Sequence, residues 1–367
     1  MQLDFHYYAT YCAAFLAGYN HDESCDIAYS AQFVDCCTST YLKKIDGSQK
    51  ATTTQTQIEL VNSKTDFIGL QYITRIWASF HFLPHDLYSK IRASKSYKDR
   101  YHLICMPNGA LVKDTVELAK DKSLQAVGVA MHVLADTWAH SGFCGTPSLV
   151  INNTNRWFYE ILPDKSERHI SLVSSTSVKD DPDKGVYTGS LYQPSELSIM
   201  NLGHGRCGHL PDYSYARYKY LPAWGNYNER IKDNPSDYYH AFAQMVYAMK
   251  YLRGNISEFE TDKYDFDGIA AYKGEIMRII EERRTDASAD WKAFGESLSG
   301  CIIPDFDVNA YTKEFISDKD KISRKKTFLG LFIKAAVSHK SMVTNRIFKS
   351  RNLLAGFSRD YKITDDN

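Results

Sequence analysis

The stretch that decides the fold is His132-Val-Leu-Ala-Asp136-Thr-Trp-Ala-His140, which lies in a largely apolar segment that starts at residue 125. In a helix these three polar residues stand four positions apart, and each step of four turns the side chain by about 40°. They therefore share one stripe among apolar neighbours. A lone buried histidine is most often a satisfied core residue, but two imidazoles around a carboxylate need partners, which a shared metal ion supplies. The stretch predicts a buried helix that binds metal.

Composition limits the classes of protein that fit. The 367 residues suffice for one large domain or two ordinary ones, and 44% are hydrophobic, enough for a substantial core. The 44 basic and 44 acidic residues cancel, which argues against a broad nucleic-acid-binding or anionic-membrane surface. There is no basic leader, no apolar run of about 20 residues and no paired-cysteine motif. We expect a cytoplasmic protein with reduced thiols and no transmembrane segment, in which Cys144 and Cys207 are minor candidates for zinc binding.

Apolar residues recur at helical spacing along most of the chain. The pattern predicts helices over residues 4–18, 22–38, 111–119, 122–141, 236–252, 264–283, 288–299 and 321–340. Residues 46–66 are interpreted as a loop or a short hairpin, and residues 142–215 as a long irregular excursion over the surface. We predict a mainly α protein, with a helical metal-binding domain over residues 1–255 and a helical C-terminal extension over residues 256–367 packed on it.

Four further segments carry ligand-type residues in apolar or aromatic surroundings. They contain His6, Asp35, His81 and, in a glycine-rich stretch, His204, His209 and Asp212. Each residue alone has a plain structural explanation. Together with the helix stripe they suit zinc, with manganese or iron as alternatives, and they outnumber the ligands of one ion. A shared Asp136 would bridge two ions about 3.5–4 Å apart, the arrangement that clamps a phosphoryl displacement.

In the order of these segments the chain resembles the zinc-dependent phospholipase C and single-strand nuclease superfamily, an all-α fold with up to three zinc ions. It also resembles an uncharacterised bacterial family that shares the motifs. His6 resembles the superfamily's histidine on the first helix, Asp35 its aspartate that serves the phospholipases as base, and His81 a ligand histidine beside an aromatic residue. The His-x-x-x-Asp helix with a further histidine matches residues 132–140, and residues 204–212 resemble the closing segment. The resemblance spans about residues 1–250 in motif order.

The resemblance implies a phospholipase C/nuclease-like helix bundle with two or three zinc ions and Asp35 as ligand and base. It implies hydrolysis of a phosphoester by metal-bound hydroxide, with a phospholipid, a nucleotide or single-stranded nucleic acid as substrate. The closing segment departs from the family's His-x-x-x-Glu, since it reads His204-x4-His209-x2-Asp212. The secreted phospholipases begin with a processed tryptophan whose amino group binds zinc, whereas this chain begins Met1-Gln2.

Two other interpretations stay open. An HD-type phosphohydrolase would use a His-Asp pair, and two pairs exist, His21-Asp22 and His85-Asp86, although helix capping explains Asp22 better. A non-catalytic helical interaction or effector protein, with structural metal or none, is the other interpretation.

Two features bear on the substrate. The segment from Tyr213 to Tyr220 interleaves tyrosines with cations, as sites for single-stranded nucleic acid do, but a tyrosine-rich packing segment explains it better. Arg206 and Arg156 are candidates for stabilising negative charge on a reacting phosphoester.

Overall fold

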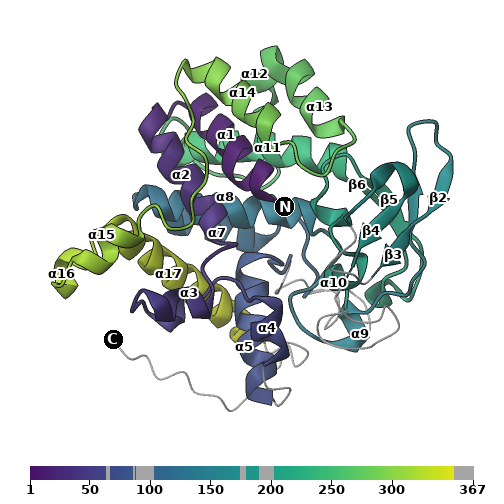
Figure 1. The fold of residues 1–367 in the computed structure, drawn as a ribbon, viewed down its shortest axis with the longest axis horizontal. Helices are drawn as coiled ribbons and strands as arrows, with labels where there is room; N and C mark the ends of the chain where they lie inside the picture. The colour runs from purple at the N-terminus through teal and green to yellow at the C-terminus, as the bar shows by residue number, and fades with distance from the viewer. Residues whose placement is uncertain (63–66, 86, 88–102, 174–178, 190–201, 351–367) are drawn as a thin grey trace.

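The computed structural model describes residues 1–62, 67–85, 87, 103–173, 179–189 and 202–350. Helices form most of this described part, and short strands gather at one side of it (Figure 1). The prediction of a mainly α protein is therefore confirmed.

The described helices range from one turn to 22 residues, and the symbol η denotes a 3-10 helix or, for η1, a π-helix. The first ten are η1 (Asp4–Ala9), α1 (Thr10–Leu16), α2 (His21–Phe33), α3 (Ser39–Lys44), η2 (Gln49–Ala51), α4 (Gln57–Val61), α5 (Phe67–Phe80), α7 (Ala110–Ala119), α8 (Leu124–Ala139) and α9 (Leu149–Asn152). The others are η3 (Pro182–Lys184), α10 (His204–Cys207), η5 (Leu210–Asp212), η6 (Ala223–Gly225), α11 (Asn234–Leu252), α12 (Phe266–Ile269), η7 (Ala270–Tyr272), α13 (Lys273–Glu281), α14 (Ser288–Ser299), α15 (Thr312–Ser317), α16 (Lys321–Arg324) and α17 (Phe328–Lys349).

Helix α8 is the centre of the bundle. Helices α2, α7, α11 and α17 pack around it, and every side chain from Val127 to Ala139 is buried. Helix α2 approaches especially closely at Gly128, where a Cβ atom would lie 2.4 Å from the carbonyl oxygen of Ile27. The residues of α8 that the sequence marks as metal ligands are therefore held in the protein interior.

The helices after residue 255 share their apolar core with the N-terminal helices. The indole of Trp291 on α14 stacks on Phe242 of α11, with ring centroids 5.4 Å apart, and meets Phe5 of η1 edge-on at 6.0 Å. Phe332 on α17 belongs to the same core. The C-terminal helices thus cover the bundle, while the proposed domain boundary at residue 255 stays a prediction.

The region 142–215 contains strands that the sequence did not indicate. One antiparallel sheet has the strand order β2-β1-β5-β6, with β1 (Tyr159–Ile161), β2 (Glu167–His169), β5 (Arg217–Tyr220) and β6 (Arg230–Asp233). A second sheet pairs β3 (Ser171–Val173) in parallel with β4 (Val186–Thr188). These strands span three or four residues each, too few for an alternating pattern to be recognised in the sequence. The interpretation of residues 142–215 as an irregular excursion was therefore wrong for β1 to β4, whereas β5 and β6 lie beyond that range.

A second apolar cluster lies in this strand-bearing region. It contains Tyr213, Tyr215, Tyr218 and Tyr220, all of them buried. The packing explanation of this tyrosine-rich segment is thereby confirmed.

Three other boundaries differ from the sequence prediction. Part of the expected loop at residues 46–66 is helix α4, which begins with a capping box between Thr56 and Glu59. The expected helix over residues 264–283 is broken into α12, η7 and α13, and the one over 321–340 into α16 and α17. Among the described helices, none combines the length and apolar character that a bilayer crossing requires.

Candidate metal centre

Five of the predicted ligands meet around the carboxylate of Asp136, which is 1% exposed. Its Oδ1 lies 3.1 Å from His6 Nε2, and its Oδ2 lies 3.2 Å from both His81 Nδ1 and His132 Nε2. The carboxylate of Asp35 completes the group, with Oδ1 3.7 Å from His81 Nδ1 and 3.9 Å from His132 Nε2. We call these five residues the inner cluster.

Separate elements hold the inner cluster together. His6 lies on the π-helical turn η1, and π-helical turns occur frequently at functional sites because they re-aim side chains. Asp35 lies in the turn that follows α2, and its amide donates to Gln32 O at 3.0 Å. His81 directly follows α5, and its amide donates to Trp77 O at 3.0 Å.

A second group adjoins the first, and we call it the outer cluster. It contains the Met1 amino group, His140 at the C-cap of α8, His204 at the start of α10 and Asp212 at the end of η5. Asp212 Oδ1 lies 3.0 Å from the Met1 nitrogen, 3.1 Å from His140 Nε2 and 3.3 Å from His204 Nε2. The Met1 amino group also donates to Asp136 Oδ1 at 3.0 Å, so it joins the two clusters.

The Met1 amino group was not among the predicted ligands, because the start of the chain departs from the family pattern. The signal that would have placed it is His6, since a ligand five residues into the chain keeps the amino group close by. Burial lowers the pKa of the amine, but the carboxylates of Asp136, Asp212 and Asp35 outweigh this effect and raise the pKa to about 11.

Hydrogen bonds fix the tautomers of two histidines. His81 Nε2 lies 3.0 Å from Thr53 O, and His140 Nδ1 lies 2.7 Å from His81 O. A carbonyl only accepts, so these nitrogens carry the proton and the other ring nitrogens present lone pairs to the centre. The rings of His6 and His132 stack with centroids 3.8 Å apart, and their Nδ1 atoms have no hydrogen-bond partner among the described residues.

The pKa shifts differ among the candidate ligands. Burial lowers the pKa of His81, but its hydrogen bond to Asp136 and the charge of Asp35 outweigh burial and raise it, so metal binding would displace a proton there. Burial is the main effect that lowers the pKa of His6, His132 and His140 to about 4, so these imidazoles are neutral at pH 7. Burial raises the pKa of Asp136, but His140 and the Met1 amine outweigh it and hold the pKa well below its usual range. Burial also raises the pKa of Asp35. Neutral imidazoles and ionised carboxylates are the forms that bind metal.

The spacing of the donor atoms also fits a metal centre. Ligands at 2.0–2.1 Å from a tetrahedral ion lie about 3.3–3.4 Å apart, and the nitrogen–oxygen distances in these clusters run from 3.0 to 3.9 Å. Three groups have ligand atoms within 4.8 Å of one another, and these are His6-Asp35-His132, His81-His132-Asp136 and His140-His204-Asp212. The clusters can therefore hold metal.

His209 lies at the edge of the site. Its Nδ1 is 3.2 Å from Asp212 Oδ2, and its side chain is 54% exposed. This hydrogen bond to Asp212 is the main effect that raises the pKa of His209. His209 therefore orients a candidate ligand but stands outside the three groups.

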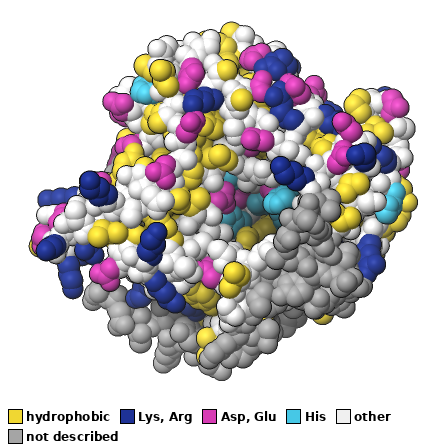
Figure 2. Space-filling model, viewed as in Figure 1, with side chains coloured by type: hydrophobic (Ala, Val, Ile, Leu, Met, Phe, Trp, Pro, Cys, Tyr) yellow, Lys and Arg dark blue, Asp and Glu magenta, His cyan; other side chains and the backbone are white. Residues whose placement is uncertain are grey.

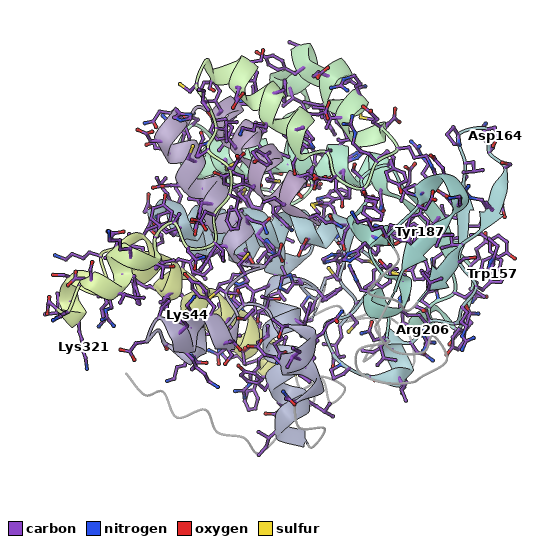
Figure 3. The ribbon with its side chains drawn as sticks, viewed as in Figure 1. Lys44, Trp157, Asp164, Tyr187, Arg206 and Lys321 are labelled. Carbon is purple, nitrogen blue, oxygen red and sulfur yellow. The ribbon has the colours of Figure 1, made fainter. Side chains whose placement is uncertain are left out.

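The candidate arginines and cysteines lie outside the three groups of metal-ligating residues. Arg206 donates to Asn153 Oδ1 at 3.3 Å and to Thr154 O at 2.6 Å, in the strand-bearing region where Tyr187 also lies (Figure 3). Arg156 is exposed. All eight cysteines are free thiols, and none belongs to the three groups found among the described residues.

The His-Asp pairs do not contribute to the described groups. His21 Nδ1 lies 2.7 Å from the Tyr11 hydroxyl. The expectation that Asp22 caps α2 was wrong, because the N-cap is Asn20 in a capping box with Glu23, and Asp22 lies in the first turn, where the helix dipole favours a carboxylate. Of the other pair, Asp86 lies outside the described residues.

A cavity of about 210 Å³ opens beside the outer cluster. His204 forms part of its wall together with the rings of Trp77 and Phe82 and the amides of Gln55 and Asn152. Figure 2 shows histidine and carboxylate side chains gathered in a hollow near the middle of this face of the molecule. Most of the candidate ligands are therefore buried, and the cavity beside His204 can accept a small group.

Comparison with known proteins gives a family and no function. A family model described as a family of unknown function (DUF6765) matches residues 1–347. No curated protein and no solved structure matches the chain.

Proposed function

The chain belongs to the DUF6765 family, and we propose that it is a metal-dependent phosphoester hydrolase. The observation that carries the proposal is the convergence of histidines and carboxylates from distant segments on Asp136. A purely structural role would need one closed set of four ligands. In this chain the donors of the inner and outer clusters exceed that number.

We assign two ion positions to these donors, with zinc as the preferred metal and manganese or iron as alternatives. The inner cluster would hold one ion, and His140, His204 and Asp212 of the outer cluster would hold the other. The Met1 amine, whose raised pKa keeps it protonated, would have to lose its proton before it could bind metal. Asp136 offers Oδ1 toward both sets, so it is the natural bridging ligand. When bound, a metal pair lowers the pKa of a water molecule and neutralises charge on a phosphoester.

Asp35 is our candidate for the general base. It is the most accessible carboxylate of the two clusters, with 29% of its side chain exposed, whereas Asp136 and Asp212 are almost fully buried. It would accept a proton from the water whose oxygen forms the new bond to phosphorus, while the bond from phosphorus to the leaving oxygen breaks. The cavity beside His204 would receive one organic group of the substrate, against Trp77 and Phe82.

The test combines metal analysis with turnover. Native mass spectrometry of the purified protein should show two or more divalent ions per chain. Hydrolysis of bis-nitrophenyl phosphate should stop with a chelator and return with zinc or manganese. Phospholipid, nucleotide and single-stranded nucleic acid assays then separate the three substrate classes. Bound metal without turnover on any of them would support a structural metal protein instead, and a folded, metal-free chain would overturn the proposal.

A further inference from the structure

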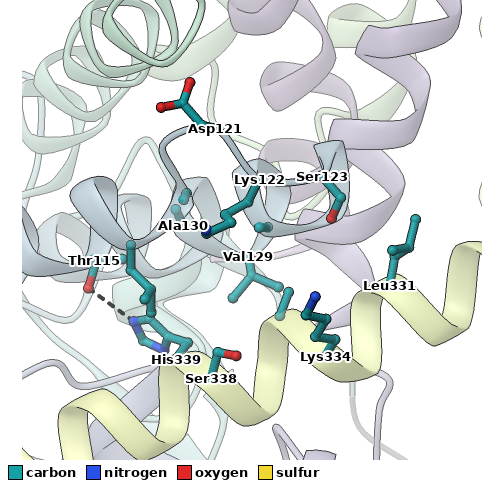
Figure 4. A pocket seen from close by; sticks show the side chains of 14 residues that line it. Thr115, Asp121, Lys122, Ser123, Val129, Ala130, Leu331, Lys334, Ser338 and His339 are labelled. Carbon is teal, nitrogen blue, oxygen red and sulfur yellow. Dashed lines mark hydrogen bonds between the residues drawn. The ribbon is translucent and has the colours of Figure 1, made fainter. Parts of the chain in front are cut away.

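A second cavity, of about 430 Å³, lies away from the metal centre between α7, α8 and α17 (Figure 4). None of the residues assigned to the inner or outer cluster lines it. Its volume falls in the range of small-molecule sites, about 300–1,000 Å³. This space goes beyond the proposed hydrolase site.

Small residues on two facing helices leave the space open. Ala126 and Ala130 stand one turn apart on α8, and Leu331 and Ala335 one turn apart on α17. Val129 adds to the apolar wall. The lining between the ends of the cavity is therefore mainly aliphatic, and it suits an apolar chain.

The floor of the cavity has a fixed polar group. His339 on α17 is 3% exposed, and its Nε2 lies 3.0 Å from the Thr115 hydroxyl, the bond drawn in Figure 4. Its Nδ1 has no hydrogen-bond partner among the described residues. Burial lowers the pKa of His339 to about 3, so the floor carries no charge at neutral pH.

The rim of the cavity carries two ammonium groups. Lys122 precedes α8 and Lys334 lies on α17, and both side chains are exposed. Neither forms an ion pair with another described residue, although ion pairs are frequent elsewhere on this surface. The carboxylate of Asp121 points away from α17 in Figure 4. The positive charges of Lys122 and Lys334 are therefore not neutralised by an ion pair with a described residue.

The first turn of α8 adds to this positive rim. Ser123, the N-cap residue, makes no side-chain hydrogen bond to its helix, and the helix runs for 16 residues. The amides of Leu124 and Gln125, next in the chain to Ser123 on the cavity wall, favour an anion nearby, whereas the amide of Ala126 donates to Ser123 O at 2.9 Å.

We propose that this cavity binds a small amphipathic carboxylate, with its apolar chain between α8 and α17 and its carboxylate at Lys122 and Lys334. An aliphatic interior with cations only at the mouth matches such a molecule in both polarity and charge. Asp121 beside Lys122 keeps the net positive charge of the rim small, which suits one negative charge better than the two of a phosphate monoester.

Decanoate is the probe, measured by isothermal titration calorimetry on the full, metal-loaded protein. We expect saturable binding of one decanoate per chain. Decyl phosphate, 1-decanol and decyltrimethylammonium should each bind at least tenfold more weakly. The variant Lys122→Ala/Lys334→Ala should weaken decanoate binding at least tenfold and leave decanol binding unchanged. Lys349→Ala removes a charge from the same helix outside the cavity, and it should change nothing.

Filling the cavity gives an independent test. Ala335→Phe should abolish binding of both decanoate and decanol, and circular dichroism reports whether this variant is folded. If it is not, Ala126→Leu fills the opposite wall and replaces it. Absence of saturable decanoate binding would overturn the proposal, as would undiminished binding in a folded, filled variant. Tighter binding of decyl phosphate would replace the carboxylate by a phosphate monoester.

Discussion

Asp136 Oδ1 lies 3.1 Å from His6 Nε2, although 130 positions separate the two residues in the chain. The contact exists because η1 brings His6 onto the face of α8 that carries Asp136, and both side chains are buried there. The same oxygen accepts from the Met1 amino group at 3.0 Å. One carboxylate thus connects the first residues of the chain with the central helix, and metal binding should depend on it.

Asp136→Asn is expected to remove most of the bound metal. The amide keeps the shape of the side chain but loses the charge that faces both clusters. A change at a residue that only orients a ligand costs about 10–100-fold in metal affinity, and loss of a bridging ligand costs more. His209→Ala is the matched control, because His209 contacts Asp212 from outside the three groups. Elemental analysis of both proteins checks the order, and equal metal loss with intact folding would contradict the bridging role.

Asp35→Asn should lower kcat for bis-nitrophenyl phosphate by about 10²–10⁴-fold, the usual contribution of a general base. Metal content should fall much less than in the Asp136 variant, because Asp35 lies at 3.7–3.9 Å from the ring nitrogens rather than at 3.1–3.2 Å. Asp22→Asn, a carboxylate in the first turn of α2, serves as control. Unchanged kcat in Asp35→Asn would remove it as the base.

The candidate ligands on α8 could be predicted from the sequence because they interrupt an otherwise apolar helical pattern. His132 and Asp136 are polar residues in an apolar helix, and their spacing of four places them on one face. That Asp35 and His81 lie beside them could not be derived from spacing, since the turn after α2 and the end of α5 meet only through packing. Their inclusion depended on the family resemblance in motif order.

The rest of the fold depended on signals that are weak or absent in the sequence. Helix α4 could have been found, because Thr56 and Glu59 form a capping box that is visible in the chain. The strands could not, because each spans only three or four residues, too few for an alternating pattern, and the buried tyrosines of β4 and β5 pack in a cluster that the sequence does not reveal.

Gly128→Ala tests the packing that brings α2 to α8. The new Cβ would lie 2.4 Å from Ile27 O and 2.5 Å from Ser30 Cβ, so the helices must separate. Overpacking of this kind costs about 1–3 kcal/mol, and the shift moves Asp35 relative to His132. Chemical denaturation measures the loss of stability. Gly274→Ala on α13, where a Cβ meets nothing within 4 Å, should instead stabilise the protein by up to about 1 kcal/mol. Equal effects of the two changes would contradict the close approach.

His339→Gln tests whether burial of this histidine on α17 lowers the free energy of unfolding at acid pH. Burial lowers the pKa of His339 from 6.5 to about 3 in the folded protein. Below pH 6.5 this histidine is therefore protonated in the unfolded chain, while it stays neutral in the folded protein. The free energy of unfolding must therefore fall as the pH drops from 6.5 toward 3, with no contribution from this residue above that window. Between pH 7.5 and 4.5 the contribution is about 2–3 kcal/mol, since each pKa unit is worth about 1.4 kcal/mol.

Glutamine can keep the hydrogen bond to the Thr115 hydroxyl but cannot titrate, so this variant should lose that much less stability over the same pH range. Denaturation of the chelator-treated protein and variant at both pH values measures the effect of His339, which includes its smaller charge repulsion with His132. His240→Gln, the same replacement at a partly buried histidine on α11, is the control. A pH dependence that is the same with and without His339 would show that another group is responsible for the acid sensitivity.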